Sequence, residues 1–243
     1  EKDIQAGNLV LHEPQTNFRL IRQLVHGMPE LIKITVLEGW NFHKVAEALE
    51  NTLGIHQEKV TDLCMDRWFI RSMAIKTPTL EGFLFPETYY FVETESPRTI
   101  LKKMVSEYQD QMSDEMKIRA EELGLSELQL ITLASIIEGE AIHDKERGNI
   151  SSVYHNRLNR GMRLQADPTI QYIIKDGPRR LLNKDLNIKS PYNTYLNDGL
   201  PPGPINNPGL KSILAALYPA ESDYIYFVAK GDGYHTFSRT QEE

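Results

Sequence analysis

Two glutamates, Glu138 and Glu140, are the residues of this chain best placed for acid–base chemistry. They lie in the segment ASIIEGEA (134–141), which otherwise has the composition of a buried helix. A carboxyl group held against an apolar surface has a raised pKa, so it can keep its proton near neutral pH and act as a general acid. The segment therefore predicts a functional carboxyl group at the end of a buried helix.

A helical wheel does not choose between the two glutamates. Ser126 and Gln129 have capping-box spacing, which predicts a helix that begins at residue 127. At about 100° per residue, the apolar residues form one stripe, and Glu138 and Glu140 lie on its opposite borders. The opposite face is expected to carry Thr132, Ser135 and Gly139. Either glutamate can also be read as a rim carboxylate that points into water, since charged side chains are rarely buried unpaired.

Four polar segments follow this helix and carry groups suited to a sugar polymer. They are HNRL (155–158), RLQADPT (163–169), SPYNTY (190–195) and GLPPGPI (199–205). Each also has a purely structural interpretation, because Pro, Gly and Asn favour rigid turns. Asn156 lies on an expected helix, where a solvated position is the default, and Asp167 can simply cap the helix that follows it.

Length and composition exclude several classes of protein. The 243 residues suffice for one large domain or two modest ones, and 40% apolar with 25% charged residues is typical of a soluble globular protein. The net charge of −7 argues against a general nucleic-acid binder. No apolar run approaches the roughly 18 residues of a membrane span. Cys64, the single cysteine, is expected in the core and cannot form an internal disulfide.

Several catalytic motifs are missing from the sequence. It contains no HExxH, paired CxxC, Walker A loop, GxGxxG or GxSxG motif. We therefore expect neither a metal nor a cofactor, and the carboxyl groups remain as the reactive groups.

The coarse pattern of elements predicts an α+β fold. A unit of strand, turn, helix and glycine occurs twice, first as a strand within 6–13 and a helix over 16–27, then as a strand over 32–40 and a helix over 41–54. A domain boundary is expected near 74–79. Further helices are expected over 57–65, 97–123, 150–160, 169–175 and 210–218, and a strand over 224–230.

From about Gly82 onward the chain resembles the YceG-like family, the endolytic murein transglycosylases. The match is carried by EGFLFPETY, ASIIEGEA, SSVYHNRLNRGMRLQADPTIQY, SPYNTYLNDGLPPGPINNPG and HTFSRT. The N-terminal part, with AGNLVL and TVLEGWNFHKVAEAL, is similar to the LysM-like region of that family. The resemblance implies a LysM-like glycan-binding module over 1–76 and a mixed α+β catalytic domain over 77–243.

The resemblance also implies an enzymatic activity, binding partners and a cellular location. Enzymes of this family cut glycan strands of peptidoglycan internally, at the β-1,4 bond between N-acetylmuramic acid and N-acetylglucosamine, and leave 1,6-anhydro ends. The implied partners are those strands and peptidoglycan synthases, with no nucleic acid. The implied location is the periplasmic face of the bacterial inner membrane, through a single upstream anchor that this chain does not contain.

By the same resemblance, the first glutamate of the pair, Glu138, is the general acid and then the base, and Glu140 supports it. Gly139 departs from the larger polar residue of many relatives, which is expected to loosen the turn. An oxocarbenium-like transition state also needs donors and dipoles. The candidates for that role and for holding the sugar are Asn156, Gln165, Asp167, Tyr192, Asn193 and Thr194.

Two alternatives remain open at this level. A hydrolytic muramidase would need a second carboxylate about 5 to 9.5 Å from the acid, and Asp167 or Glu140 is available for that role. A glycan-binding scaffold without catalysis would need only the N-terminal module, but it would leave the acid on the apolar helix without a purpose.

Overall fold

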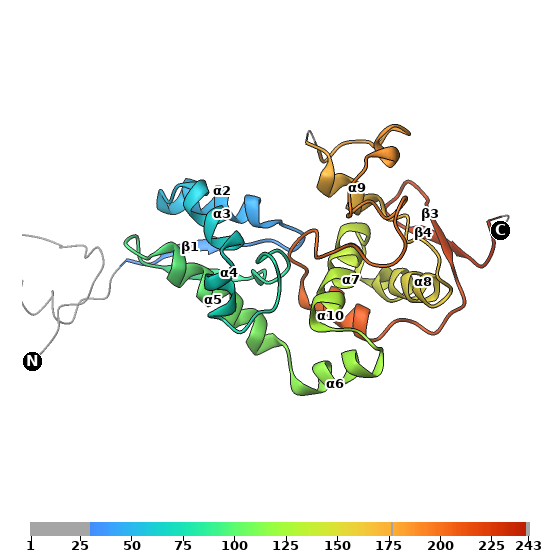
Figure 1. The fold of residues 1–243 in the computed structure, drawn as a ribbon, viewed down its shortest axis with the longest axis horizontal. Helices are drawn as coiled ribbons and strands as arrows, with labels where there is room; N and C mark the ends of the chain where they lie inside the picture. Colours follow the sequence, from blue (N-terminus) through green and yellow to red (C-terminus); the bar gives the residue numbers. More distant parts are fainter. Residues whose placement is uncertain (1–29, 176, 242–243) are drawn as a thin grey trace, which may run out of the picture.

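The computed structural model describes residues 30–175 and 177–241, and these form a mixed α+β protein (Figure 1). The strand expected within 6–13 and the helix expected over 16–27 lie outside the described residues, as does the first copy of the expected repeat. Within the described ranges, none of the helices combines the length and apolar character needed to cross a membrane.

The N-terminal half contains a short strand followed by a run of helices. In chain order these are β1 (Ile32–Thr35), α2 (Phe42–Leu53), α3 (Gln57–Met65) and α4 (Arg67–Arg71), and then β2 (Thr88–Phe91) and α5 (Pro97–Gln111). Both expected ends of α2 are confirmed. The Asn41 side chain accepts the Lys44 N–H, and Gly54 closes the helix at φ 67°.

The small sheet of this half crosses the boundary expected near residue 76. Strands β1 and β2 pair antiparallel, from Ile32 opposite Phe91 to Thr35 opposite Thr88. Buried residues on both sides of residue 76 also belong to one hydrophobic cluster, which runs from Ile34 to Leu217. The division into 1–76 and 77–243 stays a prediction, and the described residues of both parts share one core.

The single helix expected over 97–123 is wrong, because the chain forms two helices there. Helix α5 ends at Gln111, and α6 (Asp114–Glu122) begins after Ser113, whose side chain accepts the Met116 N–H. Met112 turns into the core between them. The signal was present in the sequence, since Ser113 precedes two acidic residues in the usual order of a helix start.

Helix α7 (Glu127–Glu140) lies at the centre of the C-terminal half, in contact with α6, α8, α9 and α10 (Figure 1). Its expected capping box is confirmed: Ser126 and Gln129 bond each other's backbone N–H. The face that carries Thr132 and Ser135 is buried as well, because every residue from 130 to 137 is buried. The hydroxyl groups of Thr132 and Ser135 are accommodated by donating to carbonyls of α7 itself.

The rest of the C-terminal half surrounds α7. It comprises η1 (Asp144–Glu146), α8 (Arg147–Asn159), α9 (Asp167–Ile173), η2 (Asp185–Asn187), α10 (Leu210–Leu217) and the hairpin of β3 (Tyr226–Ala229) with β4 (His235–Ser238). Figure 1 shows this hairpin at the outer side of α8.

The loop before α10 joins the two halves through its backbone. Asn207 donates its N–H to the Trp40 carbonyl at 2.8 Å and accepts the Gly39 N–H at 3.0 Å. Its side-chain oxygen accepts the Leu84 N–H at 3.0 Å. Because Asn207 is fully buried, these bonds are shielded from water and fix the turn before α2 against the C-terminal half.

We expect Gly82→Ala to be strongly destabilising, because the halves meet there without space for a side chain. Gly82 has φ +87°, and a Cβ atom would lie 2.5 Å from Pro204 and 2.8 Å from Ile131. The backbone penalty and the overpacking sum to about 2–5 kcal/mol of unfolding free energy. Urea unfolding measures this loss. Gly54→Ala is the matched control, since it has φ +67° with no neighbour within 4 Å and should lose only about 1–2 kcal/mol. Equal losses would contradict the packing argument.

Candidate active site

Glu140, the last residue of α7, is the enclosed acid of the site. The pKa of its carboxyl group is raised to about 7, chiefly by burial and in part by the charge of Asp167. The Tyr154 hydroxyl, which donates to Glu140 at 2.8 Å, and the Asp167 N–H act in the opposite direction. A carboxyl group in this range is substantially protonated at neutral pH, so it can both give and take a proton.

Two hollows meet at Glu140. A cleft of about 600 Å³ runs between the two halves, and a smaller pocket of about 190 Å³ lies beside it. Glu140 and Asp167 line both. The cleft is further lined by Gly39, Asn41, His43 and Lys44 of the N-terminal half and by Gly139, Pro168, Gln171, Tyr172, Ile174, Lys175, Gly177, Pro178, Ile205 and Asn206 of the C-terminal half.

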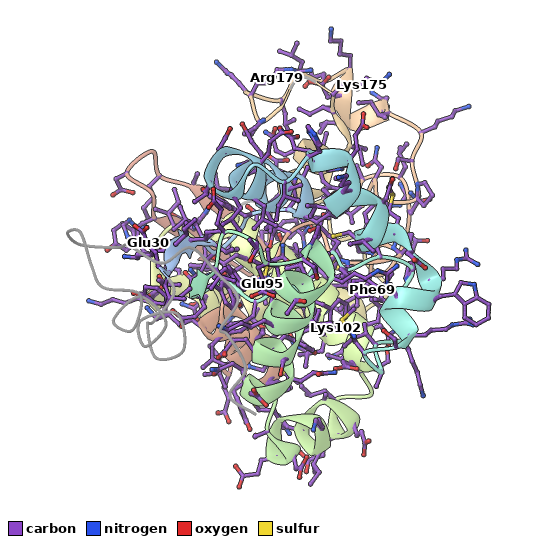
Figure 2. All side chains as sticks on the ribbon, turned by 90° about the vertical axis from the view of Figure 1, so that its left-hand side faces the viewer. Glu30, Phe69, Glu95, Lys102, Lys175 and Arg179 are labelled. Carbon is purple, nitrogen blue, oxygen red and sulfur yellow. The ribbon has the colours of Figure 1, made fainter. Side chains whose placement is uncertain are left out.

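The outer end of the cleft is formed by the residues that follow α9. Lys175 lies there, at the top edge of the molecule in Figure 2. The cleft therefore reaches from the molecular surface down to Glu140. Such an open groove can accept a long chain molecule along its length.

Glu138, by contrast, is not among the residues that line either hollow in the described part of the chain. Its carboxylate forms an ion pair with Arg147 at 3.1 Å and accepts the Gly209 N–H at 3.0 Å. The side chains of Glu138 and Arg147 are only 6% and 8% exposed. Glu138 thus sits in a buried ion pair where α7 meets α8 and the start of α10.

Asp167 and Gln165 are the other sequence candidates that face a hollow. Asp167 is exposed at the start of α9 and accepts the Tyr195 hydroxyl at 2.5 Å. Gln165 has φ +49°, donates its N–H to the Thr194 carbonyl at 3.1 Å and lines the smaller pocket with Asp167. The structure therefore brings Glu140, Gln165 and Asp167 together.

Three other candidates use their polar groups to hold the backbone. Asn156 donates to the carbonyls of Ser222 and Tyr224 at 2.8 and 2.9 Å. Asn193, which is fully buried, donates to two carbonyls of the preceding loop. Thr194 accepts the Ala166 N–H at 2.9 Å. Thr194 thus holds the segment that joins Gln165 to Asp167, whereas Asn156 and Asn193 hold other parts of the C-terminal half.

Tyr192 lies next to the cleft and is not among its lining residues. Its ring packs at a tilt against Tyr172, with centroids 5.1 Å apart, and Tyr172 lines the cleft. Tyr192 therefore supports the aromatic part of the wall from behind.

Gly139 permits a close approach of α9 to α7. A Cβ atom at Gly139 would lie 2.6 Å from Pro168. Helix α7 continues through Gly139 to Glu140, so the expected loosening of the turn is not seen. The absence of a side chain instead sets how near Asp167 and Glu140 lie.

Sequence reasoning missed several residues of the site. Tyr154 and Tyr195 lie inside or beside the segments already identified, but only their hydroxyl contacts to Glu140 and Asp167 distinguish them from core tyrosines. Other missed lining residues with polar side chains include Asn41, His43, Lys44, Arg157, Gln171, Asn206 and His235. The lining residues of the N-terminal half belong to no sequence pattern that marks them as part of a site, because their role arises from packing across the cleft.

Comparisons with known proteins agree with these motifs. The model of the YceG-like family matches residues 1–243. A Bacillus subtilis protein named endolytic murein transglycosylase is 37% identical over 98% of this chain and 71% of its own length. A protein of that name from Streptococcus pneumoniae is 31% identical over 99% of this chain, which spans 49% of that relative. The crystal structure of a yceG-like protein from Listeria monocytogenes has a TM-score of 0.80 at 34% identity, over 98% of this chain and 83% of its own.

We expect Tyr154→Phe to raise the pKa of Glu140 further. The change removes a hydrogen bond that favours the ionised carboxylate, and such bonds to charged groups are worth about 1.5–3 kcal/mol, or about one to two pKa units. A ¹³C NMR titration of labelled glutamate carboxyl carbons measures the shift. Tyr90→Phe, on an exposed position of β2, is the control. An unchanged or lowered pKa in Tyr154→Phe would contradict the arrangement.

Proposed function

Because this chain belongs to the YceG-like family, we propose that it is a lytic murein transglycosylase that cuts the glycan strands of peptidoglycan. The observation that carries the proposal is Glu140, an enclosed carboxyl group with a pKa of about 7 where an open cleft meets a small polar pocket. An acid of this kind is what cleavage of a glycosidic bond without a metal requires. The names of the relatives support murein as the substrate and the cell wall as the place of action.

The finer reaction is a cleavage in which the sugar supplies its own nucleophile. Protonated Glu140 gives its proton to the oxygen that leaves, the bond between N-acetylmuramic acid and N-acetylglucosamine breaks, and an oxocarbenium-like centre develops. The Glu140 carboxylate then takes the proton of the muramoyl 6-hydroxyl, whose oxygen bonds to C1. Atoms and protons balance, and the closure of a 1,6-anhydro ring within one sugar has the advantage of proximity.

We propose Glu140 rather than Glu138 as the acid and base. The resemblance to the family pointed to the first glutamate of the pair, and that assignment stays a prediction. The contacts favour the second glutamate, because Glu140 faces both hollows whereas the Glu138 carboxylate is occupied by Arg147 and Gly209. In this division of roles, Glu138 stabilises the end of α7 that presents Glu140.

Asp167 is the residue through which the hydrolytic alternative would operate. It lines the same two hollows as Glu140, so it is positioned to act as the second carboxylate of a muramidase. In the lytic reaction the same carboxylate would stabilise developing positive charge at C1 without activating water. The products distinguish these two roles.

We further propose that the N-terminal half binds the glycan within the same cleft. Asn41, His43 and Lys44, at the start of α2, line the wall opposite Asp167 and Gln171. A LysM-like module over 1–76 would then supply part of the catalytic groove as well as affinity. Asn207, which bonds to the backbone beside Trp40, holds this wall in place.

We expect Glu140→Gln to abolish cleavage and Glu138→Gln to act mainly on stability. The first change removes the only proton donor of the proposed step, which is worth about 10²- to 10⁴-fold in rate. The second leaves Arg147 without one of its two carboxylates and should lower the unfolding free energy by up to about 3–5 kcal/mol. Release of soluble fragments from purified sacculi, normalised to folded protein, measures the rates, and thermal unfolding measures the stability.

The reverse pattern would overturn this division of roles. A folded Glu138→Gln that is inactive beside an active Glu140→Gln would return the acid to the first glutamate. Full activity in both variants would contradict the proposed function itself.

We expect the products to carry 1,6-anhydromuramic ends, each one water lighter than the hydrolytic product. Internal cleavage should also give a spread of fragment lengths rather than disaccharides alone. Mass spectrometry of digested sacculi measures both properties. Asp167→Asn is the informative variant: it should slow the reaction and leave the products anhydro. A majority of reducing muramic ends that disappears in Asp167→Asn would establish the hydrolytic alternative.

A further inference from the structure

A histidine that lines the smaller pocket, His235, is paired with a buried carboxylate. Glu146, in η1, accepts the ring Nδ1–H of His235 at 3.0 Å and the backbone N–H of the same residue at 2.9 Å. The two side chains are only 9% and 10% exposed. One buried carboxylate therefore holds both the backbone of β4 and the orientation of the imidazole ring.

This contact determines which ring nitrogen of His235 faces the pocket unpaired. A carboxylate can only accept, so Nδ1 carries a proton; in the neutral form of the ring, Nε2 then carries a free lone pair. Within the described part of the chain, Nε2 has no hydrogen-bond partner and is not among the buried unpaired atoms. Since His235 lines the same pocket as Glu140, Nε2 of the neutral ring offers that pocket an open acceptor.

Aromatic neighbours keep the ring in this orientation. Phe227, which also lines the pocket, meets the His235 ring edge to face, with centroids 5.1 Å apart, and Phe237 lies on another side at 6.2 Å. Rotation of the imidazole would break the contact to Glu146. The apolar surroundings also strengthen a hydrogen bond made at Nε2.

The other polar groups of the pocket are largely occupied by the protein. Arg157 donates to the carbonyls of Ile225 and Leu164, and the Tyr195 hydroxyl donates to Asp167. The pocket volume of about 190 Å³ equals about six water molecules, so a group that enters it also lies near Glu140. A small ring with several hydroxyl groups fits both the size and the open acceptor.

We propose that His235 is a substrate-binding residue whose Nε2 accepts a hydrogen bond from a hydroxyl or acetamido N–H of the N-acetylated sugar beside the bond that is cut. Glu146 is the positioning residue that holds the ring. The inference rests on the proposed function, because it takes the smaller pocket as part of the glycan site. His235 fixes the sugar relative to Glu140 and takes no part in proton transfer.

Two substitutions separate this role from a merely structural one. In His235→Gln the side-chain amide reaches the position of Nε2 and keeps an acceptor toward the pocket. In His235→Asn the amide reaches the position of Nδ1 and keeps the contact to Glu146. We expect His235→Asn to lower kcat/KM on sacculi by about 10-fold or more, and His235→Gln to recover most of that loss. Activity retained in His235→Asn and lost in His235→Gln would overturn the proposal and leave His235 as a link between β4 and η1.

A binding experiment keeps the inference separate from the proposed function. In the full chain carrying Glu140→Gln, a soluble tetrasaccharide of alternating N-acetylglucosamine and N-acetylmuramic acid is titrated against ¹⁵N-labelled histidine. We expect the Nε2 resonance of His235 to move while Nδ1 changes little, and Glu146→Gln to weaken the response. Normal cleavage by Glu140→Gln would refute the acid assignment alone, whereas an unmoved Nε2 resonance under saturating tetrasaccharide would refute the role of His235.

Discussion

The enclosure of α7 on all sides is the constraint on which the rest of the structure depends. A helix buried from residue 130 to 137 can reach the surface only at its ends, and its last turn carries both glutamates. Residues two apart on a helix differ by about 200° in direction, so one glutamate points toward α8 and the other toward the hollows. The same desolvation that raises the pKa of Glu140 also makes Glu138 depend on Arg147.

The walls around this helix end are joined by backbone contacts that leave little freedom. Pro168 lies against Gly139, Asn207 bonds to the turn before α2, and Gly82 packs against Pro204. A glycan in the cleft would therefore meet residues of both halves in a geometry formed beforehand. Preorganisation of this kind is what a transition state rich in developing charge requires.

Polar residues near the site serve two purposes, which differ in whether their side-chain polar groups already have hydrogen-bond partners within the protein. Asn156, Asn193 and Thr194 use their side-chain groups on backbone partners, so their contribution is to hold loops in place. The Nε2 atom of His235 has no hydrogen-bond partner in the described residues, and His235 lines a hollow. A ligand that makes a hydrogen bond to Nε2 would therefore bind more tightly. A loop-holding residue and a ligand-binding residue therefore differ in whether a polar atom lacks a partner, and the residue type alone does not tell them apart.

The sequence alone determined features that depend on near neighbours in the chain. The Asn41 and Ser126 caps, the Gly54 stop, the position of α3 and the family membership follow from local chemistry or ordered motifs. Only the tertiary structure decided the burial of the second face of α7, the opposite surroundings of Glu138 and Glu140, and the N-terminal wall of the cleft. The physical reason is that burial, ion pairing and pKa depend on partners far away in the sequence, such as Arg147, Gly209 and Tyr154, whereas a helix cap depends on residues within one turn.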